Sequence, residues 1–192
     1  MAQEIEIEFK NLLTESEYNR LKGFLQADES NAQTHTNHYF ETAGFDLKKH
    51  GAALRIREKN KQWQLTLKEP HQEGLLETHD TLTELEAQSW LEGNIIPKPQ
   101  VAVQLNQLGI DFAELVYGGQ LKTKRIETDY KQTIVVLDHS SFNGEADFEL
   151  EVEARDRDHG KKVFEELLER VNITKKETPN KIKRFYSTLQ NR

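Results

Sequence analysis

Acidic side chains recur at every second position in two separate segments of the chain. The acids are Glu4, Glu6 and Glu8 in residues 3–10, and Glu149, Glu151 and Glu153 in residues 147–153. Side chains two positions apart on a β-strand share one face of the sheet, where like charges repel and glutamate is uncommon. Carboxylate oxygens are the ligands that Mg²⁺ and Mn²⁺ prefer. Two strands with this pattern in one chain therefore indicate a shared role, and binding a hard divalent cation is one such role.

Basic side chains alternate in the same way in the middle of the chain. Arg55 and Arg57 share one face, Lys68 shares a face with other polar residues of 62–68, and Arg125 lies in the basic run 122–125. Arginine and lysine bind phosphate oxygens, and the arginine fork does so with two parallel hydrogen bonds. A polyphosphate carried with a divalent cation would use both the acidic and the basic strands.

The apolar face of each of these strands must be buried against something else. Burying unpaired charges in a dry core is costly, so the charged faces are expected to line a space that holds water and a ligand. Closing the sheet into a barrel with its charged faces inward meets this requirement. The apolar faces then point outward, where helices cover them.

Alternation and capping signals give the elements that position these residues. Period-two patterns predict strands over 3–10, 53–58, 62–68 and 147–153. Strands are also expected over 33–42, which is rich in Thr and aromatic residues, over 75–81 and 133–138, and over 120–130 as one strand or a pair. Helices are expected from the capping box at residues 14–17, from Thr83, and over 101–108, 158–171 and 180–189. Strands that outnumber helices in this order favour an α+β fold with mostly antiparallel pairing.

Length and composition limit the class of protein. The chain has 192 residues, so we expect a single domain over 1–192, with the alternative of a boundary near Pro97 and Pro99. Asp and Glu number 33 against 26 Lys and Arg, and this net charge of −7 argues against binding to nucleic acid or to an anionic membrane. The chain has no cysteine, no apolar run long enough to span a membrane and no signal-peptide core at its start, so we expect a cytoplasmic protein. The oligomeric state does not follow from the sequence.

Several segments carry a resemblance to a known family, and they occur in the family's order. They are Glu6-Ile7-Glu8-Phe9-Lys10, His38-Tyr39-Phe40-Glu41-Thr42, Leu54-Arg55-Ile56-Arg57, Leu65-Thr66-Leu67-Lys68, Glu77, residues 123–125, Asp138, Phe148-Glu149-Leu150-Glu151 and Lys181-Ile182-Lys183-Arg184. The first of these resembles the ExExK signature of the CYTH superfamily, the triphosphate tunnel metalloenzymes. The chain looks most similar to small CYTH proteins of Firmicutes, some of which are labelled adenylate cyclases. The resemblance implies a closed eight-stranded antiparallel β-barrel, a tunnel with a charged interior, flanked by helices.

The same resemblance implies roles for individual residues. The metal ligands, for Mg²⁺ or Mn²⁺, would be Glu6, Glu8, Glu149, Glu151 and Glu153. The phosphates would be bound by Lys10, Arg55, Arg57, Lys68 and Arg125, with Lys181, Lys183 and Arg184 closing one end as a basic plug. Glu77 and Asp138 would position metal or water. Arg125 and Asp138 share a face only if a turn or bulge interrupts residues 129–132.

The expected function is metal-dependent hydrolysis of a small-molecule triphosphate or polyphosphate, such as inorganic, nucleoside or thiamine triphosphate. Two alternatives stay open: a class IV adenylate cyclase, and a non-catalytic module that binds polyphosphate or a nucleotide. Positioning and charge neutralisation supply most of the catalysis of phosphoryl transfer, and the assigned residues offer both. No base-recognition signature accompanies them, which favours hydrolysis over cyclisation.

Overall fold

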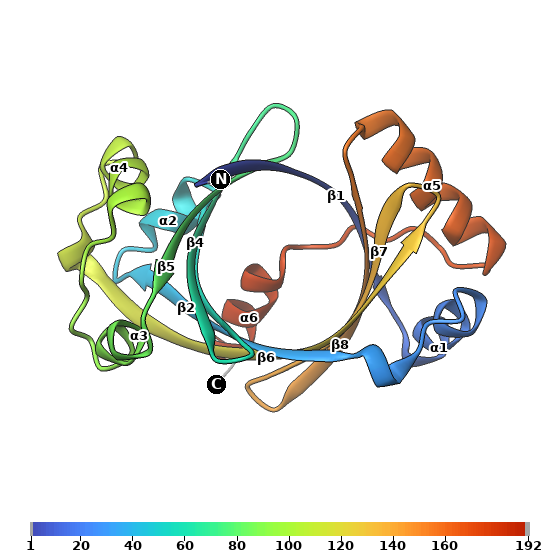
Figure 1. Cartoon of the computed structure of the whole chain (residues 1–192), viewed down its shortest axis with the longest axis horizontal. Coiled ribbons are helices and arrows are strands. Elements are labelled where there is room, and N and C mark those ends of the chain that lie inside the picture. The colour runs from blue at the N-terminus through green and yellow to red at the C-terminus, as the bar shows by residue number, and fades with distance from the viewer. Residues whose placement is uncertain (1, 191–192) are drawn as a thin grey trace. The chain divides into compact units, whose positions relative to one another are not determined.

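The structure, a computed structural model, describes residues 2–190 and contains a closed antiparallel barrel of eight strands (Figure 1). The strands are hydrogen-bonded in the order β1-β5-β4-β3-β2-β6-β7-β8. Their bounds are β1 (Gln3–Leu13), β2 (Gln33–Thr42), β3 (Ala53–Lys59), β4 (Gln62–Pro70), β5 (Leu75–Leu82), β6 (Leu115–Tyr130), β7 (Thr133–Phe142) and β8 (Glu145–Ala154). The helices are α1 (Glu15–Phe24), α2 (Asp46–Lys49), α3 (Glu84–Leu91), α4 (Pro99–Gln107), α5 (Arg157–Arg170) and α6 (Lys181–Gln190). The expected fold class is confirmed.

The chain divides into two compact units. The first comprises Met1–Ile5 and His35–Leu121, and the second comprises Glu6–Thr34 and Lys122–Arg192. Pro97 and Pro99 both lie inside the first unit, so neither marks its limit. Pro99 instead occupies the first turn of α4, where a missing N–H costs nothing.

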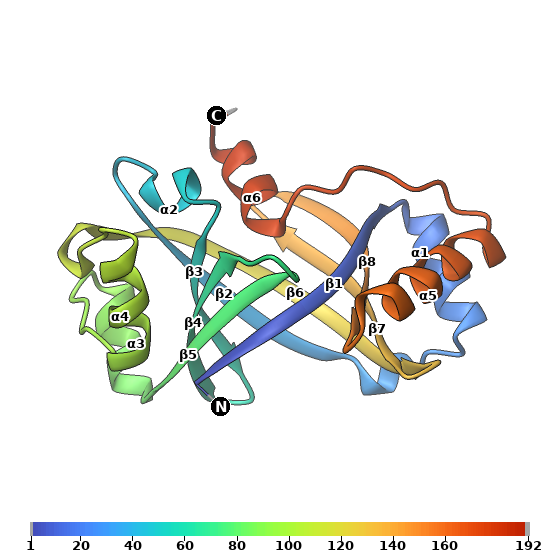
Figure 2. The ribbon, with the colours of Figure 1, turned by 90° about the horizontal axis from the view of Figure 1, so that it is seen from above.

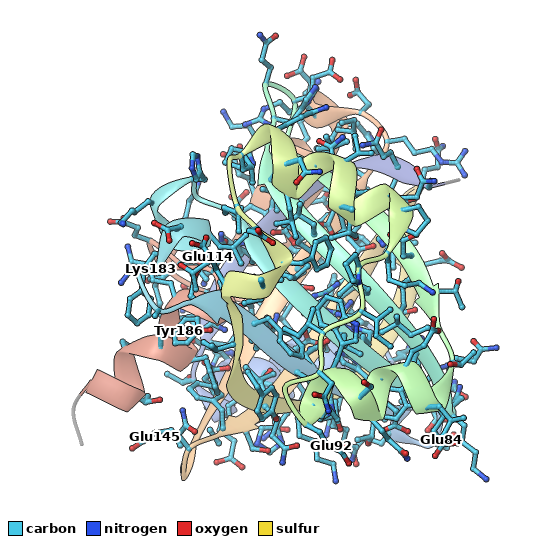
Figure 3. All side chains as sticks on the ribbon, turned by 90° about the vertical axis from the view of Figure 1, so that its left-hand side faces the viewer. Glu84, Glu92, Glu114, Glu145, Lys183 and Tyr186 are labelled. Carbon is cyan, nitrogen blue, oxygen red and sulfur yellow. The ribbon has the colours of Figure 1, made fainter. Side chains whose placement is uncertain are left out.

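In the first unit, the hydrophobic core lies between β3, β4 and the helices α3 and α4. Figure 3 shows these two helices in front of the strands, with Glu84 and Glu92 marking the ends of α3. The core includes Leu54, Ile56, Leu65, Leu67, Ala87, Trp90, Val101 and Leu105, all fully or almost fully buried. Each strand contributes only the residues of its apolar face, so the charged residues 55, 57 and 68 lie on the face away from this core.

The second unit repeats the arrangement with β7, β8, α1 and α5. Its core includes Tyr18, Leu21, Val135, Leu137, Leu150, Val152, Val163, Phe164 and Leu167. Leu137 lies directly opposite Leu150 in the sheet, and the acidic residues of β8 take the alternate positions. The apolar layer therefore lies under the helices in both units, as the strand patterns predicted.

Tight turns join the hairpins and set their register. Asn60-Lys61, Lys131-Gln132 and Asn143-Gly144 all have positive φ, which is the backbone of the two-residue turns that suit twisted hairpins. The turn at Lys131-Gln132 pairs Arg125 directly with Asp138. The interruption expected within residues 129–132 is therefore confirmed as the β6–β7 turn.

The helices differ from the sequence expectation in two places. α4 begins two residues early because Pro99 starts it, and the short α2 was not predicted. Two capping boxes, on Thr14 with Glu17 and on Thr83 with Glu86, begin α1 and α3. Among the residues that the structure describes, none of these helices has the length and apolar character needed to span a membrane.

Candidate functional site

A buried group of charges lies on the sheet of the second unit. Arg125 of β6, Asp138 of β7 and Glu149 of β8 occupy directly opposed positions on three adjacent strands. The Arg125 guanidinium donates to both carboxylate oxygens of Asp138, with Nε–Oδ1 at 2.8 Å and Nη2–Oδ2 at 2.7 Å. Its Nη2 also donates to Glu151 Oε2 at 2.6 Å. Arg125 and Asp138 therefore form a bidentate ion pair, which the sequence did not predict.

Two basic side chains from α6 complete this group, and Figure 2 shows α6 beside the β7–β8 turn, where β8 starts. Lys181 Nζ lies 2.9 Å from Asp138 Oδ2, 2.6 Å from Glu149 Oε1 and 2.5 Å from Glu151 Oε1. Arg184 Nε donates to Asp147 Oδ2 at 2.7 Å, and Arg184 Nη2 forms an ion pair with Glu149 Oε2 at 2.5 Å. We name Arg125, Asp138, Glu149, Glu151, Lys181 and Arg184 the buried ion cluster.

The carboxyl groups of the buried ion cluster differ in the direction in which their pKa values are shifted. Burial raises the pKa of Glu149 to about 7 against the attraction of Lys181, and the nearby Glu151 carboxyl adds to the rise. Burial would raise the pKa of Glu151 as well, but Lys181 and Arg125 outweigh it and hold that pKa well below its usual range. The same two cations lower the pKa of Asp138 despite its burial. The surroundings therefore push the pKa values of Glu149 and Glu151 in opposite directions, with Glu149 the weaker acid of the two.

The acidic start of β1 lies against the acidic end of β8. Glu8 is directly opposite Glu153, and Lys10 is directly opposite Glu151. Lys10 Nζ contacts Glu8 Oε1 at 2.5 Å, and Arg125 Nη1 lies 3.7 Å from Glu153 Oε1. Like charges on opposed positions destabilise a strand pair unless a cation lies between them. Glu6 shares the face of Glu8, one step nearer the N-terminus, and is half-buried.

The donor atoms of the second unit are of the chemical kind that a hard divalent cation binds. Lys181 Nζ already occupies a position surrounded by oxygens of Asp138, Glu149 and Glu151 at 2.5–2.9 Å. An all-oxygen, mostly carboxylate set is what Mg²⁺ and Mn²⁺ take. Mg²⁺ or Mn²⁺ at Glu149 or Glu151 would compete with Lys181 for the same oxygens.

In the first unit, Arg55 and Arg57 lie on the face of β3 turned away from the core. Arg57 Nε donates to Oδ1 of the buried Asn37, directly opposite on β2, at 2.9 Å. Arg55 Nε is buried and makes no hydrogen bond with any residue that the structure describes. A buried donor without a partner is costly. Arg55 therefore offers a donor to a ligand, whereas the guanidinium of Arg125 is already held by carboxylates.

A second charged group in the first unit surrounds β5. Lys68 of β4 forms an ion pair with Oε1 of the buried Glu77, its direct neighbour in register. His79 lies two positions further along β5, and its Nε2 is 3.2 Å from Glu4 Oε1 and 3.4 Å from Glu77 Oε2. Period-two spacing places Glu77 and His79 on one face of β5. The sequence alone does not predict that β1, which carries Glu4, pairs with β5. Glu4 and His79 were therefore missed as a pair.

The expected site residues fall into two groups, one in each unit, and their surroundings differ. Lys183 is exposed on α6, apart from the contacts of Lys181 and Arg184 (Figure 3). Asp147 was not expected, yet it binds Arg184. Its alternation with Glu149 and Glu151 was the signal that could have identified it.

The chain is similar to several known proteins. Residues 4–186 match the model of the CYTH domain. The chain is 47% identical over 186 residues to a Bacillus subtilis (strain 168) protein named "Putative triphosphatase YjbK", covering 97% of this chain and 96% of that protein.

Solved structures share the fold. A Bacillus halodurans protein described as a "putative adenylate cyclase" is 43% identical, covers 97% of this chain and 100% of its own, and has a TM-score of 0.93. A protein from Hippeastrum, described as a "putative adenylyl cyclase" with a dominant triphosphatase activity, is 22% identical with a TM-score of 0.78. It covers 95% of this chain and 96% of its own, and at this identity it shows the fold alone.

Proposed function

The chain belongs to the CYTH family, and from that premise we propose that it hydrolyses a small-molecule triphosphate with the help of a divalent cation. The observation that carries the proposal is the buried ion cluster, in which three carboxylates surround one cationic position. The name of the Bacillus subtilis relative, at 47% identity, points to the same reaction.

The carboxylates supply the proposed cation site. Glu6, Glu8, Glu149, Glu151 and Glu153 are the proposed ligands of Mg²⁺ or Mn²⁺. When bound, such a cation neutralises phosphate oxygens and stabilises the charge that develops during phosphoryl transfer. The direct opposition of Glu8 and Glu153 supports this assignment. The two carboxylates repel each other across the strand pair, and a cation bound between them would relieve that repulsion.

The basic residues bind the phosphates in this proposal. Arg55 contributes its unpartnered Nε. Arg57 donates its Nε to Asn37 Oδ1, which orients the guanidinium on the same strand face. Lys10, Lys68, Arg125, Lys181, Lys183 and Arg184 are the further proposed contacts. Hydrolysis joins a water oxygen to the terminal phosphorus and breaks the phosphoanhydride bond, with diphosphate or a nucleoside diphosphate leaving.

Asp138 and Glu77 act through other residues. Asp138 is fully buried, and both of its oxygens are bound by cations, so its proposed role is to hold Arg125 and Lys181 in place. Glu77 does the same for Lys68 on β4. Within this proposal, the chain from residue 1 to residue 192 acts as one catalytic domain in the cytoplasm.

A panel of substrates tests the proposal. Tripolyphosphate, ATP and thiamine triphosphate are each incubated with the metal-free protein, with Mg²⁺ and with Mn²⁺, and phosphate release is measured. We expect release only with a divalent cation, and a loss of about 100-fold or more in Glu8→Gln, since one group that stabilises transition-state charge contributes on this scale. Glu15→Gln on the exposed start of α1 is the matched control. Unchanged turnover in Glu8→Gln contradicts the cation site.

A matched pair of variants in one hairpin tests the phosphate contacts. Arg55→Gln and Lys61→Gln each remove one positive charge from β3–β4, but Lys61 lies in the exposed turn. We expect Arg55→Gln alone to raise KM and lower kcat. Equal effects of the two variants would mean that Arg55 acts only through the overall charge.

A second candidate function is cyclisation of ATP, favoured by the description of the Bacillus halodurans structure. Cyclic AMP and diphosphate would then appear in place of phosphate. The same panel distinguishes the two reactions when cyclic AMP is measured beside phosphate. Saturable nucleotide binding without either product would instead indicate a binding module.

A further inference from the structure

Three potential metal ligands meet at the N-terminal end of β1 in the first unit. Glu4 comes from β1, and Glu77 and His79 come from β5. Their ligand atoms all lie within 4.8 Å of one another. Two hydrogen bonds hold the strands together here: His79 N donates to Ala2 O at 2.8 Å, and Gln3 Nε2 donates to Thr78 Oγ1 at 3.0 Å. The grouping is therefore set by strand pairing and does not depend on one side chain alone.

The separations match those of atoms that share a small metal ion. His79 Nε2 lies 3.2 Å from Glu4 Oε1 and 3.4 Å from Glu77 Oε2. Ligands of a tetrahedral Zn²⁺ lie about 2.0–2.1 Å from the metal, which places neighbouring ligand atoms about 3.3–3.4 Å apart. A charge-assisted hydrogen bond between imidazolium and carboxylate is shorter, about 2.7–2.9 Å. His79 Nε2 and Glu4 Oε1 are within hydrogen-bond distance of each other, and the imidazole also faces both carboxylates at a spacing that co-ligands of one metal ion have.

Neighbouring residues orient two of the three ligands. His79 Nδ1 is hydrogen-bonded to Oγ1 of the buried Thr66 at 3.0 Å, so that Nε2 points toward the carboxylates. Metal-binding histidines commonly have such a partner on the second ring nitrogen. Lys68 binds Glu77 Oε1, while Oε2 is the oxygen that faces His79. The carboxylates of Glu4 and Glu77 carry two negative charges, and Lys68 carries one positive charge, so the net charge around His79 Nε2 is negative.

We infer that Glu4, Glu77 and His79 form a transition-metal site, taking Zn²⁺ or Mn²⁺ in preference to Mg²⁺. The imidazole nitrogen decides this preference, because Mg²⁺ favours oxygen ligands whereas Zn²⁺ and Mn²⁺ also accept nitrogen. The site shares no residue with the carboxylates of the second unit. It goes beyond the proposed hydrolysis, since metal could bind here whether or not the chain hydrolyses a triphosphate.

The test measures metal binding by the full-length, metal-free protein without any triphosphate. Zn²⁺ is titrated by calorimetry, and Co²⁺ is followed by its visible absorption, which reports a nitrogen-containing site of low coordination number. His79→Gln is expected to abolish the Co²⁺ absorption and weaken Zn²⁺ binding by more than about 100-fold, since it removes a ligand. Thr66→Val is expected to weaken it by about 10–100-fold, the usual effect of losing an outer partner. His71→Gln, in the exposed β4–β5 loop, is the control and is expected to match the wild type.

Glu4→Gln provides a second variant that does not disturb the core, because the Glu4 side chain is 62% exposed. It is expected to weaken Zn²⁺ binding at least about 10-fold with no change in Tm. Zn²⁺ binding that is unchanged in both His79→Gln and Glu4→Gln would overturn the inference. So would Mg²⁺ binding at this site as tightly as Zn²⁺. These results are independent of phosphate release, so they separate failure of this site from failure of the proposed hydrolysis.

Discussion

Replacing Lys181 by Met is the sharpest test of how the second unit holds together. The Lys181 ammonium contacts Asp138, Glu149 and Glu151 at 2.5–2.9 Å, and its side chain is only 13% exposed. Methionine keeps most of the aliphatic stem and removes the charge. Arg125 and Arg184 then remain as the cations that face these three carboxylates.

The expected cost follows from the burial of the partners. Asp138 and Glu149 are 0% and 1% exposed in their side chains, so water does not compensate for the lost ammonium. Removing one partner of a buried ion pair destabilises a protein by about 3–5 kcal/mol. At about 2–4 °C per kcal/mol for a chain of this size, the midpoint should fall by about 6–20 °C.

Thermal unfolding in EDTA measures this loss, with Lys183→Met as the matched control. Lys183 lies on the same helix and carries the same charge, but it is exposed. A Tm for Lys181→Met within about 2 °C of the control would refute the reasoning, because it would show that α6 does not hold the carboxylates in solution. Saturating Mn²⁺ should restore part of the loss, since the cation replaces the ammonium among the same oxygens.

Three further predictions concern stability. Gly160→Ala in α5 should destabilise by about 1–3 kcal/mol in urea, because the new Cβ would lie 2.6 Å from Ala154 Cβ and 2.9 Å from the Phe9 ring. Gly23→Ala in α1, with nothing within 4 Å, should instead stabilise by up to about 1 kcal/mol, and a loss there would contradict the packing argument. Without metal, stability should rise with pH up to about 4.5, where Glu151 and Asp138 are ionised in both states, because their pKa values are lowered by folding. The free energy of unfolding should then fall between about pH 4.5 and pH 7, because folding raises the pKa of Glu149 to about 7. Urea titrations at each pH measure this fall, and Glu149→Gln should remove it. Thr14→Ala and Thr83→Ala should each cost about 1 kcal/mol by removing the helix caps, and no change in urea midpoint would show that these caps contribute nothing.

The strands and helices were largely predictable because their signals are local. Period-two alternation identified which side of each strand is charged, and the capping boxes at Thr14 and Thr83 located two helix starts. The β6–β7 turn was expected between the predicted strands 120–130 and 133–138, because Arg125 and Asp138 would lie on opposite faces of an unbroken strand. The ordered motifs, together with this pattern, were enough to indicate the family and the closed barrel.

Pairing between distant strands was not local, and tertiary structure alone decided it. Alternation placed Glu4 on a charged face, but only the contact of β1 with β5 brought it within ligand distance of Glu77 and His79. Similarly, the basic sequence of α6 did not show that Lys181 would form ion pairs with buried carboxylates while Lys183 stays exposed to solvent. The sequence by itself determined the chemical character of each strand face, because a two-residue period depends only on neighbouring backbone geometry. The sequence did not determine which strand faces meet, or which charges therefore share a cation. That depends on the register between segments tens of residues apart, and the packing of the helices and strands sets this register.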